Sequence, residues 1–344
     1  MKSIYGLDLK DLEEYFISIG EKKFRAKQLF DWLFVKRIND FDKITNISND
    51  VLSVINKDYT FDLLTIKDKQ VSNDGTIKYL FELEDGNLVE SVLMRYSYGN
   101  SVCVSSQVGC NMGCQFCASG QLKKKRDLSA GEMVLQILTI QNDLDQDEDR
   151  ISHVVVMGIG EPFDNYDNVM KFVRIINNPF GLAIGARHIT ISTCGLIDGI
   201  NKYANEDLQI NLAISLHSAI DKKRSSLMPV NKSNDLTSLK RAIKDYIKKT
   251  NRRVTFEYIM LKGVNTSKED AEALIKFVRG INAYVNLIPY NDVSNLEFES
   301  ISRDECFPFY QILKEANVNV TIRREFGSDI DAACGQLRSK RIKR

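Results

Sequence analysis

The chain has 344 residues, of which 43% are hydrophobic and 27% charged, and its formal net charge is +1. This balance is typical of a soluble globular protein, and no apolar run approaches the roughly 20 residues that a membrane-spanning helix needs. The N-terminus lacks the apolar segment of a secretory signal peptide, and three of the seven cysteines lie in one ligand-like group. A secreted disulfide scaffold is therefore excluded, and we expect a cytoplasmic protein.

The N-terminal part of the chain carries helical patterns followed by a strand hairpin. Three segments have apolar residues at helical spacing or the pattern of a short helix: 9–19, 25–36 and 48–55. Two strand-like runs, 76–83 and 88–94, are joined by Glu84-Asp-Gly-Asn, and Asp-Gly between alternating apolar runs is a strong hairpin signal. We expect residues 1–90 to form a small helical accessory domain with a hairpin that leads into the main fold.

From about residue 100, strand-like and helix-like segments alternate. The strand candidates are 101–106, 154–157, 188–193, 211–216, 254–260, 284–288 and 318–323. Three helix starts fit the capping-box pattern, namely Ser129 with Glu132, Thr266 with Glu269, and Ser302 with Glu305. Pro308 should delay or kink the last of these helices. Alternation of this kind predicts an α/β fold with a parallel sheet, and about six such units over residues 91–344 predict an open or partial (β/α)6 barrel.

Polar residues and glycines gather where these strands end. They are Gly160 and Glu161 after the second strand, Ser192 at the end of the third, Ser215, Leu216 and His217 at the fourth, and Asn291 after the sixth. Ligands of such folds bind at the carboxyl ends of the strands. Glu161 is suited to bind an ammonium group, and the hydroxyls and the amide offer hydrogen bonds. Together these residues predict a binding surface on one rim.

The loop after the first strand contains Cys110, Cys114 and Cys117. Three thiolates at this spacing can face one inorganic cluster, and because a closed [4Fe–4S] site needs four ligands, one iron would stay open to a small molecule. A structural zinc site normally needs a closed set of four ligands, and the three histidines lie far away in the sequence. Buried structural cysteines are the third interpretation. We predict an iron–sulfur cluster with an apolar wall from Phe116.

Two other cysteines have a context of their own. Cys334 stands between small residues with Gly335 behind it, which suits either an exposed nucleophilic thiol or a structural cysteine. Cys103 should point into the barrel mouth if Val102 and Val104 point the other way. Cys194 and Cys306 have no such context, and we expect them to be structural.

Basic residues form three groups, at 22–27, 123–126 and 338–344. Such groups attract phosphate backbones, although each by itself is equally typical of a solvated surface. Because one group directly follows the cysteine loop, the three together favour a nucleic-acid substrate.

The cysteine spacing resembles that of the radical S-adenosylmethionine (SAM) superfamily, and the whole chain resembles the RlmN/Cfr family of radical SAM RNA methyltransferases. The supporting stretches are Cys103-Val-Ser-Ser-Gln-Val-Gly-Cys, Gly158-Ile-Gly-Glu-Pro, Ser215-Leu-His, Asn286-Leu-Ile-Pro and Asp329-Ile-Asp-Ala-Ala-Cys-Gly-Gln-Leu. The stretches around Gly160 and Gly20 look closer to the RlmN type. That resemblance implies methylation of an adenine at C2 in 23S rRNA and in certain tRNAs, whereas the Cfr type methylates C8 of the same rRNA adenine.

The resemblance also implies cofactors, partners and roles. A [4Fe–4S] cluster on Cys110, Cys114 and Cys117 would cleave SAM, and a flavodoxin or ferredoxin would supply the electron to a monomeric enzyme. Cys334 would carry a methyl group from one SAM, and a radical from a second SAM would activate that methyl for addition to C2. Cys103 would then assist proton removal, a step it would share with Glu90 as proton acceptor, and would release the product by forming a disulfide with Cys334. The SAM pocket would comprise Gly160, Glu161, Ser192, Ser215, Leu216, His217 and Asn291. A non-catalytic RNA-binding protein with a structural metal, or a dithiol oxidoreductase using Cys103 and Cys334, are the alternatives.

Overall fold

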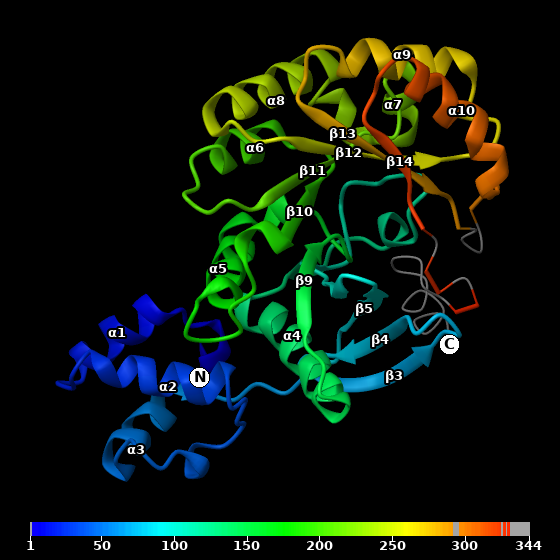
Figure 1. The fold of residues 1–344 in the computed structure, drawn as a ribbon. Helices are drawn as coiled ribbons and strands as arrows, with labels where there is room; N and C mark the ends of the chain where they lie inside the picture. Colours follow the sequence, from blue (N-terminus) through cyan, green and yellow to red (C-terminus); the bar gives the residue numbers. More distant parts are fainter. Residues whose placement is uncertain (1, 292–295, 325, 328, 331–344) are drawn as a thin grey trace.

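The computed structural model describes residues 2–291, 296–324, 326–327 and 329–330 (Figure 1). Its centre is a ten-stranded sheet in the order β14-β13-β12-β11-β10-β9-β6-β5-β4-β3. The strands from β6 to β14 in this order run parallel. They are β6 (Gly99–Cys103), β9 (Ile151–Val156), β10 (Ile189–Thr193), β11 (Asn211–Ser215), β12 (Val254–Met260), β13 (Ala283–Pro289) and β14 (Val320–Ile322).

Helices cover the outside of this curved sheet. They are α4 (Ala130–Leu144), α5 (Tyr166–Asn177), α6 (Ile197–Tyr203), α7 (Asp221–Leu227), α8 (Leu236–Thr250), α9 (Lys268–Val278) and α10 (Arg303–Glu315). Figure 1 shows them around the arch that the parallel strands form. In the part of the chain that the structure describes, β14 and β3 are the two edges of the sheet, so the barrel is open. The predicted partial barrel is therefore confirmed.

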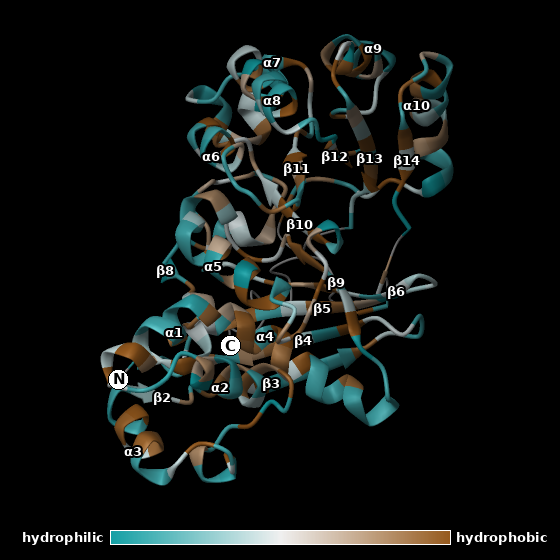
Figure 2. Cartoon of the chain, turned by 60° about the vertical axis from the view of Figure 1, so that its left-hand side comes forward, coloured by the Kyte–Doolittle hydropathy of each residue, from teal (hydrophilic) through white to brown (hydrophobic). Residues whose placement is uncertain are grey.

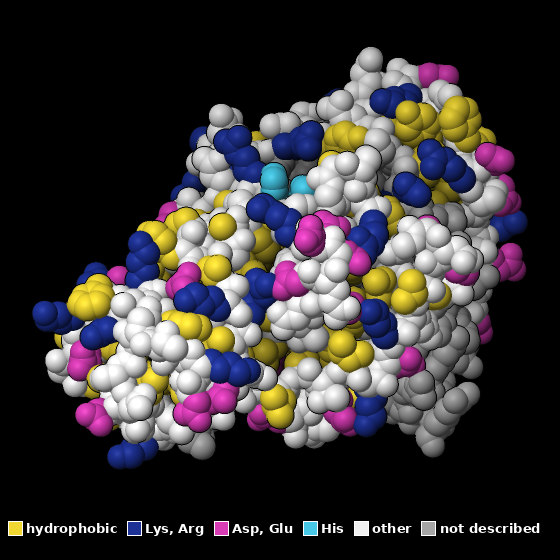
Figure 3. All heavy atoms as spheres, turned by 60° about the horizontal axis from the view of Figure 1, so that its bottom comes forward, with side chains coloured by type: hydrophobic (Ala, Val, Ile, Leu, Met, Phe, Trp, Pro, Cys, Tyr) yellow, Lys and Arg dark blue, Asp and Glu magenta, His cyan; other side chains and the backbone are white. Residues whose placement is uncertain are grey.

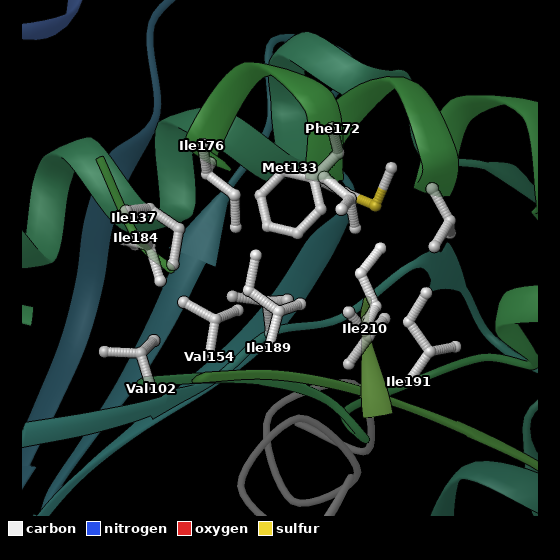
Figure 4. Close-up of a cluster of buried hydrophobic side chains, with 14 of the residues drawn as sticks. Val102, Met133, Ile137, Val154, Phe172, Ile176, Ile184, Ile189, Ile191 and Ile210 are labelled. Carbon is white, nitrogen blue, oxygen red and sulfur yellow. The ribbon is translucent and has the colours of Figure 1, made fainter. Parts of the chain in front are cut away.

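The core of the barrel lies between these helices and the strands. Met133 and Ile137 of α4 and Phe172 of α5 face Val154 and Ile189 of the sheet, and all five are fully buried (Figure 4). In Figure 2 the parallel strands β10 to β14 carry much of the brown colour that marks hydrophobic residues. This packing holds the strands on the helix-covered face of the sheet, and it leaves their carboxyl ends free to line a site.

The antiparallel part of the sheet consists of β3 (Thr65–Val71), β4 (Ile77–Glu82) and β5 (Leu88–Tyr96), and β5 pairs with β6. The hairpin of β4 and β5 was predicted, and its strands belong to the same sheet as the barrel. Strand β3 was not predicted because Lys67, Asp68 and Lys69 interrupt its apolar alternation and most of its residues are exposed. An edge strand with charged side chains is a common protection against aggregation.

The N-terminal helices are α1 (Leu9–Ser18), α2 (Phe24–Phe34) and α3 (Asn49–Asp58), which confirms the three predicted helices to within a few residues. Short strands β1 (Lys2–Ser3) and β2 (Tyr59–Thr60) pair beside them, and β7 (Gln107–Val108) pairs with β8 (Arg126–Asp127) at the cysteine loop. The buried side chains of α1 and α2 belong to the same hydrophobic cluster as those of the barrel. The boundary at residue 90 stays a prediction.

The helix starts follow the capping chemistry that the sequence predicted, with one shift. Ser129 with Glu132 and Ser302 with Glu305 form capping boxes. The third box uses Ser267 with Asp270, one residue later than predicted, because the aspartate at that position accepts from the Ser267 backbone N–H. Helix α10 begins at its cap and continues through Pro308, so it does not start late. Among the described residues, no helix is both long and apolar enough to cross a membrane.

Gln136 ties α4 to the strand ends from inside the core. Its Oε1 accepts from Ser91 Oγ at 2.8 Å and from the Ser105 backbone N–H at 2.9 Å, and its Nε2 donates to the Ser105 carbonyl at 3.1 Å. Because Gln136 is fully buried, these bonds have no water to replace them. The side chain thus fixes the segment that leads from β6 into the cysteine loop.

We predict that Gln136→Leu lowers the free energy of unfolding by at least about 2 kcal/mol, because two backbone groups of Ser105 lose their buried partner. Urea unfolding of the apo-protein, followed by circular dichroism, measures the change. Gln311→Leu on the exposed face of α10 is the matched control and should stay within about 0.5 kcal/mol of wild type. Equal effects of the two substitutions would contradict the role of Gln136.

Candidate active site

A cavity of about 370 Å³ lies at the carboxyl ends of the parallel strands. Every parallel strand of the large sheet, or the segment directly after it, contributes to its wall, and β4 and β5 close one side. The predicted residues that line it are Glu90, Cys103, Cys110, Cys114, Cys117, Gly160, Glu161, Ser192, Ser215, His217 and Asn291. The rim inferred from the strand ends is thus one site.

Two predicted residues are not part of this wall. The side chain of Leu216 is fully buried in the hydrophobic core, whereas its neighbours Ser215 and His217 line the cavity. The backbone of Leu216 is also engaged, because its N–H donates to the Glu257 carbonyl at 3.0 Å and its carbonyl accepts from Arg224 Nε at 3.2 Å. Cys334 lies outside the described residues.

The three loop thiols are close enough to influence one another. Burial raises the pKa of Cys110 to about 11, and the charge of Cys117 adds to this effect. Burial also raises the pKa of Cys114, with the charges of Cys117 and Cys110 as further causes. A metal bound to these sulfurs would stabilise their thiolates and so oppose the effect of burial.

The donor set fits a three-thiolate cluster site. Among the described residues, no group of three or more His, Cys, Asp or Glu side chains is arranged to hold a single metal ion. A [4Fe–4S] cluster binds each thiolate through a different iron and does not need the sulfurs to converge on one point. Phe116 lines the cavity beside the thiols, so the predicted apolar wall is confirmed. Gly109 has φ of +85°, and a Cβ there would clash with the Lys123 carbonyl, so the start of the loop requires glycine.

Glu161 presents a buried carboxylate between β9 and β10. Its Oε1 accepts from the Phe163 N–H at 3.0 Å and its Oε2 from the Cys194 N–H at 2.8 Å. Burial raises the pKa of Glu161, and these hydrogen bonds oppose the increase. In the part of the chain that the structure describes, no Lys or Arg forms an ion pair with Glu161. A buried carboxylate in that state fits the ammonium group of a ligand.

His217 is a neutral hydrogen-bond donor in this cavity. Burial, followed by the charge of Arg224, lowers its pKa to about 3. The Ile259 N–H donates to its Nδ1 at 3.0 Å, which leaves the ring proton on Nε2. The Phe116 ring packs edge-on against the imidazole, with the ring centroids 4.8 Å apart.

Glu90 and Cys103 face the cavity from neighbouring strands, together with Lys78, which was not among the predicted site residues. Val92 of β5 pairs with Cys103 on one side and with Lys78 on the other, so all three share one face of the sheet. Lys78 is fully buried, and its Nζ lies 2.6 Å from Glu90 Oε2. Burial raises the pKa of Cys103, whereas the charges of Arg323 and Lys78 oppose the increase. The register of the predicted hairpin could have revealed Lys78, since it places Lys78 and Glu90 diagonally across one face.

The structure also changes the interpretation of two other predictions. Cys194, expected to be structural, lines the cavity, whereas Cys306 is buried in the core as expected. In the basic group at 123–126, Lys124 binds Asp127 and Asp164, and Arg126 binds Asp85 and Glu132. Figure 3 likewise shows acidic and basic side chains interspersed on the face that it views. The group therefore carries less uncompensated charge than its sequence predicts, and the group at 338–344 lies outside the described residues.

Comparisons with known proteins agree with this geometry. Residues 2–57 match the family model "Ribosomal RNA large subunit methyltransferase N-terminal domain", and residues 104–278 match the radical SAM superfamily. Proteins named "Probable dual-specificity RNA methyltransferase RlmN" from Listeria monocytogenes and Streptococcus thermophilus are 55% identical to this chain over 99% of its length, covering 95% and 89% of their own. The crystal structure of a radical SAM methyltransferase from Sphaerobacter thermophilus matches with a TM-score of 0.92 at 40% identity, covering 98% of this chain and 99% of that chain.

We predict that Lys78→Met lowers the free energy of unfolding by about 3–5 kcal/mol, because it leaves the buried Glu90 carboxylate without its cation. Chemical denaturation of the apo-protein measures this. Lys67→Met on β3 breaks an ion pair with Glu82 in which the Lys67 side chain is 55% exposed, and it should cost no more than about 1 kcal/mol. A cost for Lys78→Met as small as that of Lys67→Met would contradict the buried ion pair.

Proposed function

The chain belongs to the RlmN family of radical SAM dual-specificity RNA methyltransferases, and on that premise we propose that it methylates C2 of an adenine in 23S rRNA and in tRNAs. The observation that carries the proposal is the content of one cavity. It combines three cysteine thiols, the buried Glu161 carboxylate, which has no cation partner among the described residues, and the pair of Glu90 and Cys103. A cluster, an amino-acid cofactor and a thiol-dependent step would each find their ligands there.

Cys110, Cys114 and Cys117 would hold a [4Fe–4S] cluster. The Glu161 carboxylate would bind the ammonium group of SAM, and Gly160, with φ of +117°, would bring the backbone close to it. Ser192, Ser215, His217 and Asn291 would complete the pocket. When bound, the cluster and SAM supply the reductive cleavage that begins the reaction. The apolar wall of Phe116 and Met228 would exclude water from it.

The position of Cys334 in the sequence supports its proposed role as methyl carrier. Asp329 accepts a hydrogen bond from the Asn73 N–H at 3.0 Å, and Gly327 donates one to Asp74 at 3.0 Å, so the chain is held at the β3–β4 turn. Phe326 already lines the cavity. Since each residue spans at most about 3.6 Å, Cys334 is tethered within about 18 Å of Asp329.

Cys103 and Glu90 would complete the reaction. Glu90 would accept the proton that leaves the adenine, and its hydrogen-bonded ion pair with Lys78 holds the carboxylate in place. Attack of the Cys103 sulfur on the Cys334 sulfur would form a disulfide and break the sulfur–carbon bond to the RNA adduct. The electron pair would remain on the methylene carbon, which takes up a proton to become the methyl group.

The same proposal includes the finer assignments. Residues 1–90 would contact RNA, and residues 91–344 would form the catalytic core with its C-terminal cysteine segment. A flavodoxin or ferredoxin would donate electrons, and the enzyme would act as a monomer in the cytoplasm. The Cfr-type alternative, methylation at C8, is not favoured because the similar proteins bear the RlmN name.

We predict that the reconstituted enzyme, incubated anaerobically with SAM, a reductant and 23S rRNA, forms 5′-deoxyadenosine and 2-methyladenosine. Mass spectrometry of the digested RNA distinguishes the 2-methyl from the 8-methyl isomer. Replacing Cys110, Cys114 and Cys117 by alanine should abolish iron binding and both products, whereas Cys306→Ala, in the core, should retain them. The 8-methyl isomer would favour the Cfr type, and RNA binding without either product would favour a non-catalytic protein.

We predict that alanine substitutions of Cys334 and Cys103 stop the reaction at two different steps. Cys334→Ala should prevent the first methyl transfer, so that intact-protein mass spectrometry finds no methylated enzyme. Cys103→Ala should accept the methyl group but remain covalently attached to RNA, because the sulfur–carbon bond is not broken. Denaturing gel electrophoresis after nuclease digestion detects that adduct. Normal turnover by Cys103→Ala would remove Cys103 from the mechanism.

A further inference from the structure

Arg224 on α7 is a fully buried cation directly behind the cavity wall. Its Nη1 donates to Asn231 Oδ1 at 2.6 Å, and its Nη2 donates to the carbonyl oxygens of Cys194 at 2.7 Å and Ser215 at 3.3 Å. Its Nε donates to the Leu216 carbonyl at 3.2 Å. All these acceptors are neutral. Over the residues that the structure describes, Arg224 forms no ion pair with a carboxylate.

A buried cation without an anionic partner is costly, and a guanidinium does not escape the cost by losing its proton. Burial lowers the pKa of Arg224, and the charges of Cys194, Cys114 and Asp221 oppose this. Asp221 forms no ion pair with Arg224 and is linked to it through Asn231, because its Oδ1 accepts from Asn231 Nδ2 at 3.0 Å and from the Leu236 N–H at 3.2 Å. A thiolate formed by Cys114 when a cluster binds it would therefore add negative charge near Arg224 that the protein otherwise lacks.

The cysteine loop packs directly against the end of α7. The Gln115 N–H donates to the Leu227 carbonyl at 2.9 Å. Phe116, Leu227 and Met228 form one apolar cluster, against which Cys114 and Cys117 pack. The medium between Arg224 and the thiols is thus protein interior, where a charge acts more strongly than across water.

We propose that Arg224 is the counter-charge of the cluster held by Cys110, Cys114 and Cys117, and that its positive charge makes this cluster easier to reduce. The inference rests on the proposed function, since it needs the cluster. A [4Fe–4S]²⁺ core with three thiolates carries one net negative charge, and one electron from an external reductant adds a second. A fixed positive charge stabilises the more negative state, so the cluster accepts the electron at a higher potential.

The structural alternative is that Arg224 only holds the ends of β10 and β11 through its fork of donors. Two substitutions separate charge from geometry. Arg224→Lys keeps the positive charge and loses the planar fork, whereas Arg224→Gln keeps a hydrogen-bonding amide and loses the charge. Arg187→Gln is the matched control, because Arg187 is exposed at the opposite end of β10 and bonds Gln209.

The experiment is an EPR-monitored redox titration of the reconstituted holoenzyme with dithionite or titanium citrate. Arg224→Gln should lower the ratio of reduced to oxidised cluster about tenfold at a fixed potential, which is a shift of about 59 mV for one electron. Arg224→Lys and Arg187→Gln should stay near wild type. Iron and sulfide content and circular dichroism verify that each variant is folded and loaded.

The outcomes are distinct. A fully loaded Arg224→Gln enzyme with the wild-type potential would overturn the counter-charge while leaving the proposed function intact. If Arg224→Gln does not retain the cluster, the titration of Arg224→Lys is decisive. A tenfold lower ratio of reduced to oxidised cluster in Arg224→Lys would mean that the planar guanidinium hydrogen bonds, and not the positive charge, set the potential. A wild-type protein that takes up no iron–sulfur cluster would instead overturn the proposed function itself.

Discussion

The constraint on which the site depends is the parallel alignment of the strands from β6 to β14. Parallel strands place all their carboxyl ends at one edge, so residues that are far apart in the sequence converge there without any loop needing to be long. The cysteine loop, the segment with Glu161, and the ends of β10 and β11 meet in one cavity for this reason. The antiparallel hairpin then extends the same sheet and adds Glu90 beside Cys103.

Charge balance inside the protein is the second theme. Lys78 and Glu90 form a buried ion pair between β4 and β5. Glu161 and Arg224, in contrast, are buried and form hydrogen bonds only with neutral groups among the described residues. Buried charges persist where something compensates for lost hydration. An ammonium group at Glu161 and an anionic cluster near Arg224 would both do so, which makes the protein's own electrostatics complementary to the cofactors of its family.

Much of the fold followed from local patterns. Helical periodicity, capping residues and the Asp-Gly turn are encoded within a few residues, so the helices, the hairpin and the strand–helix alternation were predictable. Strand β3 could not be predicted in this way, because it lies at the exposed edge of the sheet. Its charged side chains therefore do not show the alternation of apolar and polar residues that marks a half-buried strand. The capping residue of α9 was displaced by one because Ser and Thr in adjacent positions offer the same hydroxyl chemistry.

By itself, the sequence determined the types of chemistry present: the three-cysteine loop, the strand-end glutamate and serines, and the thiol of Cys103. Only the tertiary structure decided which groups share a cavity and which charges are compensated. Lys78 and Arg224 look like ordinary surface cations in the sequence, and the basic group at 123–126 looks uncompensated. Their partners come from other elements of the fold, so the physical quantity that matters, the burial of each charge and its distance to the next, exists only after folding.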